Sequence, residues 1–216
     1  MPDTIVVSVT DQIRTRIILG ELPPGKRIPL YQMAEEFGIS RVPLREAMRQ
    51  LEAEGLVDHA PRRGTVVRPL SMQDLEDCFH LLEYMEPIAA RRATTTAHPE
   101  IVADMQRWFD RMDELQDRHL SPEMLDAHRN FHFSYLNALG DGILLQLLHI
   151  LWHTCQRYVM HCTPDARRRQ RSRSQHGELI SLVAEGEGDA AADLLRRHVR
   201  EALEYSRDYM RREATA

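Results

Sequence analysis

The sequence has little cysteine and no apolar run long enough to cross a membrane. Its 216 residues include three cysteines that follow no repeating spacing: Cys78, Cys155 and Cys162. A disulfide framework is therefore not expected. The most apolar stretch, from Ile143 to Trp152, is broken by Gln146 and His149 and is too short to span a bilayer. The N-terminus has no basic segment followed by an apolar one, so we expect no signal peptide and a cytoplasmic protein.

A general excess of basic residues is also absent. The chain has 28 Lys and Arg residues against 33 Asp and Glu residues, a net charge of -5. This balance excludes a protein that coats nucleic acid over its whole surface. Residues 1–70, however, hold ten basic and nine acidic residues, so the acidic excess lies in the remainder. An acidic body with a more basic head fits a protein that meets DNA through one face.

The first 70 residues follow the layout of a winged helix-turn-helix. Apolar spacing predicts helices over residues 7–19, 30–37 and 41–54. Gly38 stands where a left-handed turn residue is needed, and Ser40 occupies the expected N-cap of the third helix. Two β-branched segments around residues 61–64 then predict a β-hairpin. We place this DNA-binding domain at residues 1–70.

The third helix of this head has two distinct faces. Its apolar residues Leu44, Met48 and Leu51 would pack against the other helices. The opposite face carries Arg41, Arg45 and Arg49, which could contact phosphates or guanine edges in a major groove. The tip of the hairpin adds Arg62 and Arg63 next to Gly64, a glycine that would let the backbone approach a minor groove. Arginines along one face of an amphipathic helix often contact only solvent. Here the preceding turn and the basic wing favour DNA binding instead.

The predicted secondary structure changes near residue 70. Only helical periodicity follows, interrupted by single Pro, Gly and Ser-Pro breakers. We predict six helices, at residues 72–97, 99–118, 122–138, 142–162, 165–184 and 189–211. The fold class is therefore mostly α, with the winged head followed by an antiparallel all-α bundle over residues 71–216.

Four of the eleven histidines would point into this bundle: His128, His132, His176 and His198. Buried imidazoles without partners are unfavourable, so several that converge are explained by a metal ion or a bound anion. His149 and His153 form a second pair four residues apart. Spacing alone does not choose between the two sets.

The head resembles the GntR family of bacterial regulators. The matching stretches run from Pro24 to Ile28, from Met33 to Ala47 and from Leu51 to Val57, followed by the Arg-Arg-Gly wing. The resemblance implies a two-fold dimer on a short palindromic DNA operator. It also implies DNA contacts from the start of the third helix and from the wing, by Ser40, Arg41, Val42, Pro43, Arg45, Arg63 and Gly64.

The body resembles the FCD ligand-binding domain of the FadR-like subfamily, in its six-helix form. The matching pieces are residues 85–90, Phe131-His132, Gln175-His176 and residues 188–199. In metal-binding relatives the corresponding positions hold a divalent ion, which implies His128, His132, His176 and His198 as ligands here. The first of these is usually aspartate. Four imidazoles leave the charge of the ion uncompensated and favour Zn, Ni or Cu over Mn, with Zn or Ni expected first.

A second departure concerns the effector. Many relatives carry an arginine on the first bundle helix that meets a carboxylate effector, and Leu82 stands at that position. We expect a small anionic effector, with Arg91, Arg92 or Arg157 as possible substitutes for the missing arginine. The sequence thus predicts a transcriptional repressor controlled by an effector at or near a metal. A metal-free pocket remains an alternative, whereas an enzyme is disfavoured because no His-Glu-x-x-His spacing occurs.

Overall fold

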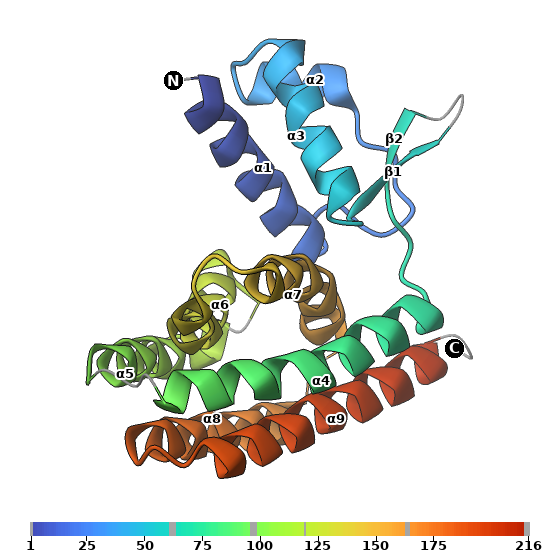
Figure 1. Cartoon of the computed structure of the whole chain (residues 1–216). Helices are drawn as coiled ribbons and strands as arrows, with labels where there is room; N and C mark the ends of the chain where they lie inside the picture. Colours follow the sequence, from blue (N-terminus) through green and yellow to red (C-terminus); the bar gives the residue numbers. More distant parts are fainter. Residues whose placement is uncertain (1, 61–63, 96–98, 119, 163–164, 214–216) are drawn as a thin grey trace.

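The computed structural model describes residues 2–60, 64–95, 99–118, 120–162 and 165–213. The head consists of α1 (Pro2–Ile18), α2 (Leu30–Glu36), α3 (Arg41–Ala53), β1 (Val57–Ala60) and β2 (Gly64–Val67). The two strands pair antiparallel, with Val57 opposite Val67 and Ala60 opposite Gly64. Figure 1 shows the three helices and the hairpin grouped above the rest of the chain. The predicted winged helix-turn-helix architecture is confirmed.

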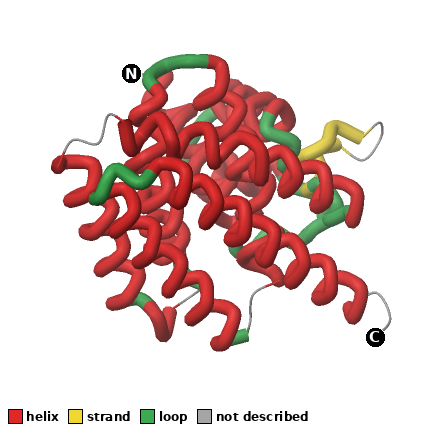
Figure 2. Tube along the Cα trace, turned by 60° about the horizontal axis from the view of Figure 1, so that its bottom comes forward, coloured by secondary structure: helices red, strands yellow, loops and turns green. Residues whose placement is uncertain are grey.

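The described part of the body contains helices and no strands. Figure 2 shows this by colour, with the helices red and the hairpin of the head yellow. Its elements are α4 (Met72–Thr95), α5 (Pro99–Glu114), η1 (Gln116–Arg118), α6 (Pro122–Leu136), η2 (Asn137–Leu139), α7 (Ile143–Cys162), α8 (Ala166–Ala184) and α9 (Gly188–Glu213). Helices α4 and α9 lie side by side along one edge (Figure 1), and α5 packs on α6. The predicted mostly α fold is confirmed.

Each part has its own core. In the head, Ile13, Ile17, Leu44 and Leu51 are fully buried. In the body, the core joins α4, α6, α7 and α9 through residues such as Phe131. Burial of these apolar side chains is the main force that holds each part together. Helix α3 packs on the core of the head, whereas the bundle interior belongs to the core of the body. They are therefore two separate candidate sites.

Helix α7 connects the body to the head. It packs against α1 (Figure 1), and the hydroxyl of Thr154 donates to the backbone carbonyl of Glu54 at 3.2 Å. Arg157 is 1% exposed, and its Nη2 donates to the carbonyl of Arg68 at 2.5 Å. The Tyr158 hydroxyl pairs with the backbone of Ser71. The junction is thus a hydrogen-bonded interface and not a bare linker.

Three local predictions differ from the structure. Helix α1 begins at Pro2 and not at residue 7, because its buried stripe starts only at Val9 and gives no signal for the preceding turns. Ser40 occupies the N-cap position with extended backbone, but its side chain makes no capping hydrogen bond. The helices predicted over residues 99–118 and 122–138 end earlier, in the short 3-10 turns η1 and η2.

Candidate functional site

The recognition face of α3 is exposed, as its pattern predicts. Leu44, Met48 and Leu51 are buried against the head core. The guanidinium-bearing residues Arg41, Arg45 and Arg49 are exposed, as are Ser40 and Val42, while Pro43 is half-buried. Gly38 has φ +63°, so it supplies the left-handed turn that aims α3 away from α2. The structure therefore presents one basic helix face to a possible DNA groove.

The wing is described only in part. Gly64 begins β2 with φ +74°, a conformation that favours glycine. Arg62 and Arg63, both predicted DNA contacts, lie outside the described residues. A bridge between Arg27 and Val66 fastens the hairpin to the segment that precedes α2. The hairpin is thus attached to the same small domain that carries the recognition helix α3.

The bundle brings three of the four predicted histidines together. His128 and His132 come from α6, and His176 comes from α8. One nitrogen of each lies within 4.8 Å of the others, an arrangement that could hold a metal ion. The Nε2 atoms of His132 and His176 are 3.2 Å apart. Two ligands about 2.05 Å from one tetrahedral zinc ion would be about 3.3 Å apart, so this spacing suits a shared ion.

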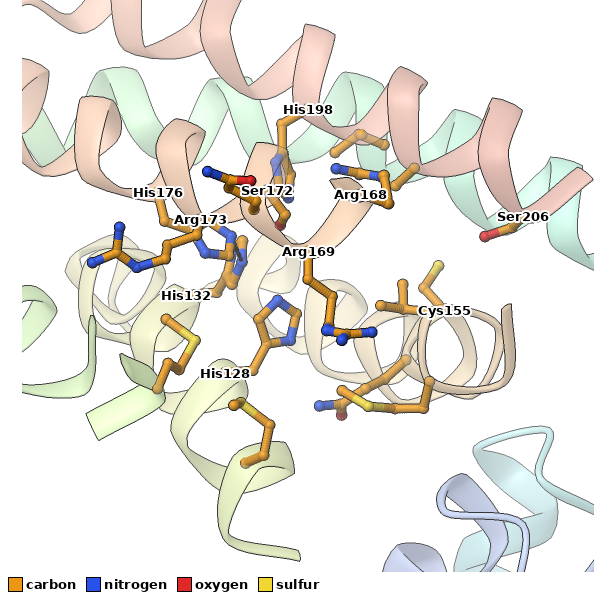
Figure 3. Close-up of a pocket in the computed structure, with 18 of the residues that line it drawn as sticks. His128, His132, Cys155, Arg168, Arg169, Ser172, Arg173, His176, His198 and Ser206 are labelled. Carbon is orange, nitrogen blue, oxygen red and sulfur yellow. Dashed lines mark hydrogen bonds between the residues drawn. The ribbon is translucent and has the colours of Figure 1, made fainter. Parts of the chain in front are cut away.

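His198 lies beside this trio, on α9. Its ring centroid is 4.9 Å from that of His176 and 5.9 Å from that of His132. Figure 3 shows His198 pointing from α9 into the same cavity as His128, His132 and His176. It is not one of the three residues whose ligand atoms lie within 4.8 Å of one another.

Hydrogen bonds orient two of the rings. Nδ1 of His198 donates to the side-chain oxygen of Gln175 at 2.9 Å, and the amide of Gln175 donates to Glu201. This leaves Nε2 of neutral His198 as a lone-pair atom. Nδ1 of His132 is 3.0 Å from the hydroxyl of Tyr135. Such outer partners are typical of histidines that ligate metals.

All four imidazoles are neutral near pH 7. Burial, together with the nearby positive charge of Arg168, lowers the pKa of His128 to about 4 and that of His198 to about 3. Burial also moves the pKa values of His132 and His176 well below 6.5. Neutral imidazole is the form that binds a metal ion. Nδ1 of His128 is buried without a hydrogen-bond partner among the described residues, so the donor set fits a metal ion.

Sequence reasoning missed a buried carboxyl group beside the histidines. Glu86 on α4 is 1% exposed, and its Oε1 accepts from the indole N–H of Trp152 at 2.7 Å. The same oxygen is 4.0 Å from Nδ1 of His132. Burial raises the pKa of Glu86 to about 7. A metal ion nearby would favour its ionised form, which would compensate part of the ion's charge.

The second histidine pair lies elsewhere. His149 stacks on Phe133 with ring centroids 4.3 Å apart, and His153 is buried on the side of α7 that faces the head, near Arg14 and Arg129. Neither lines the cavity that contains the other four. The geometry therefore separates two pairs that the sequence left equivalent.

The predicted substitutes for the missing effector arginine do not reach this cavity. Arg91 pairs with Asp189 at 2.6 Å, Arg157 donates to the head, and Arg92 is exposed away from the lining. These three suggestions are wrong because none of the residues lines the cavity. The cavity instead contains Arg168, Arg169 and Arg173 from α8, while Leu82 lines it from α4. Arg168, Ser172 and His176 repeat every four residues, and that stripe was the available sequence signal.

Comparisons with known proteins identify both parts. A model of the FCD domain matches residues 77–201, more than half of the chain, and a model described as bacterial regulatory proteins, gntR family, matches residues 6–67. The chain belongs to the GntR family. Its winged head is a GntR DNA-binding domain, and its helical body is an FCD domain.

Individual GntR regulators match nearly the whole chain. The Bacillus subtilis (strain 168) HTH-type transcriptional regulator YdhC is 25% identical over 210 residues, covering 94% of this chain and 92% of its own length. The Escherichia coli (strain K12) HTH-type transcriptional repressor GlaR is 26% identical and covers 87% of this chain and 89% of its own. These relatives are transcriptional regulators and not enzymes.

A solved structure supports the fold. The chain described as E. coli McbR/YncC superposes with a TM-score of 0.81 at 17% identity, covering 91% of this chain and 94% of that one. Among the described residues, none of the helices has the length and hydropathy that a membrane crossing requires. This GntR-family chain is thus a DNA-binding transcriptional regulator with a helical domain behind its head.

Proposed function

We propose that this GntR-family regulator is a repressor whose operator affinity is set by a small anionic effector in the FCD cavity. The observation that carries the proposal is the cluster of His128, His132 and His176 inside a cavity of about 580 Å³. A cavity of this size takes a small organic ligand. The relative GlaR, which is named as a repressor, supports the direction of control.

The histidines would hold a divalent ion, with Zn or Ni favoured. Three neutral imidazoles, with His198 beside them, form a nitrogen-rich set that suits these ions. Such an ion would supply a positive centre for an anionic effector. A metal-free cavity is the second candidate, because the 3.2 Å approach of His132 to His176 also suits a direct hydrogen bond.

The regulator would act as a homodimer on a palindromic operator. Exposed apolar side chains on α4 support a self-interface: Leu81 is 50% exposed, Tyr84 74% and Ile88 43%. They fall on one stripe of the helix. Two heads related by a two-fold axis would present two copies of α3 to successive major grooves.

Operator binding by the full chain tests the DNA-reading part of this proposal. The operator would first be selected from random duplexes with the wild-type protein. We expect Arg45→Ala to weaken binding to that operator at least tenfold, because a guanidinium contact with a base or a phosphate is lost. Arg107→Ala, an exposed arginine on α5, is the matched control and should bind like the wild type. Equal operator affinity for Arg45→Ala and the wild type would refute this docking of α3.

A further inference from the structure

The cavity extends well beyond the histidines. Three helices line this extension of the cavity with residues about one turn apart, which lead away from the histidines. On α9 the steps are His198, Ala202 and Ser206, and on α4 they are Glu86, Leu82 and Phe79. Helix α7 runs alongside with Trp152, Gln156 and Val159. Ser206 lies eight residues after His198, which is about 12 Å along the helix, far more than an ion and a two-carbon acid would fill.

This extension is apolar or uncharged on three sides. Beyond Glu86, Trp152 and His198, the described side chains that α4, α7 and α9 give to the cavity are Phe79, Leu82, Cys155, Gln156, Val159, Met160, Val199, Ala202 and Ser206. None of these nine carries a charge at neutral pH, because burial raises the pKa of Cys155 well above 9. A second acidic group in this part of a ligand would be desolvated without a cation from these helices.

The positive charges come from α8. Figure 3 shows Arg168 and Arg169 on the turns that precede His176, with Arg168 close to His198. Nη1 of Arg168 is buried and has no hydrogen-bond partner among the described residues. Arg173 differs, because it pairs with Asp113. A buried guanidinium nitrogen without an acceptor is costly, and a carboxylate matches the planar fork of arginine.

We propose that the effector is a monocarboxylate with an apolar chain, whose carboxylate is bound by Arg168 next to the histidines and whose chain lies between α4, α7 and α9. This inference rests on the proposed function only in taking the cavity as the effector site. The guanidinium of Arg168 replaces, from another helix, the basic group that Leu82 does not provide. An extended chain advances about 1.2 Å per bond, so the 12 Å extension of the cavity accommodates about eight to ten carbons.

Direct binding of simple acids to the full chain tests this proposal. Calorimetry would compare octanoate with butanoate, which shares its head, and with suberate, which has the same length and a second carboxylate. We expect octanoate to bind at least tenfold tighter than either. Suberate that binds as tightly as octanoate would overturn the monocarboxylate assignment, and so would the absence of octanoate binding.

Matched variants locate the two ends of the ligand. Arg168→Gln should weaken octanoate binding at least tenfold, whereas Arg167→Gln, an exposed neighbour outside the lining, should leave it unchanged. Ala202→Leu should narrow the extension of the cavity, and should weaken octanoate binding several-fold while leaving butanoate binding unchanged. Unchanged octanoate affinity in Arg168→Gln would overturn the role of this residue.

The outcome is separable from that of the proposed function. Metal content and operator affinity are measured on the same proteins without any acid present. Failure of octanoate to bind a chain that holds metal and recognises its operator would overturn only the ligand class. Loss of operator binding would instead refute the proposed function itself, and absence of bound metal would favour its metal-free form.

Discussion

Several histidines in the body have pKa values far from those of free imidazole. The pKa of His128 is lowered to about 4, that of His198 to about 3 and that of His153 to about 2, each mainly by burial. In an unfolded chain these groups titrate near 6.5. Between the two values the unfolded chain binds more protons, so stability is complete above pH 6.5 and falls as the pH drops.

This shift predicts acid sensitivity of the metal-free protein. His128 alone accounts for roughly 3 kcal/mol of stability lost between pH 7 and pH 4. Glu86 acts in the opposite sense, because its raised pKa of about 7 makes the folded state bind an extra proton, but it is one group against several. Urea unfolding in the presence of a chelator at pH 7 and pH 5 measures the effect. Equal stability at the two pH values would show that these histidines are not buried as described.

The sequence predicted residues well where a helical stripe decides their direction. Leu44 and His132 point inward because their neighbours four residues away do so, and the structure buries both. Glu86 escaped prediction because its partner, Trp152, is 66 residues away in the chain. Spacing alone left the two histidine pairs equivalent for the same reason, and only the resemblance to the FCD domain favoured His128 and His132. The choice depends on which face of α7 meets the head, and that contact is tertiary.

Among the elements, α7 serves both halves of the molecule. One face carries Trp152 and Gln156 into the cavity, while another bears Thr154 and Arg157 against the head. Most helix ends were predicted within two residues, since Pro, Gly and Ser mark them. The role of α7 as a junction was not predicted, because hydrophobic periodicity does not reveal which element covers which.

Arg157→Leu tests this junction. The change removes the donor to the carbonyl of Arg68 and leaves that acceptor without its partner, which costs roughly 1–3 kcal/mol. We expect calorimetry to resolve two unfolding transitions in the variant and one in the wild type, because the head and body lose a shared contact. Arg107→Leu on exposed α5 is the control. A single unshifted transition in Arg157→Leu would mean that α7 does not couple the two parts.

At the scale of the whole molecule, two heads are needed to read a palindrome. Tyr84→Glu places a charge in the centre of the apolar stripe on α4, where burial against a second copy would be costly. We expect sedimentation equilibrium to give twice the chain mass of 25.1 kDa for the wild type and the single mass for the variant. The control Glu100→Gln alters an exposed acidic residue at the start of α5 and should remain dimeric. A dimeric Tyr84→Glu protein would move the interface to another surface.

The histidine cluster is the feature on which the account of regulation depends. Elemental analysis of the tag-free protein, purified without chelator and then offered Zn or Ni, tests it most directly. We predict about one divalent ion per chain in the wild type, a large loss in His132→Ala, and full occupancy in His149→Ala, whose ring lies outside the cavity. No bound ion in the wild type after Zn and Ni are offered, or equal metal content in His132→Ala, would contradict the proposed metal site.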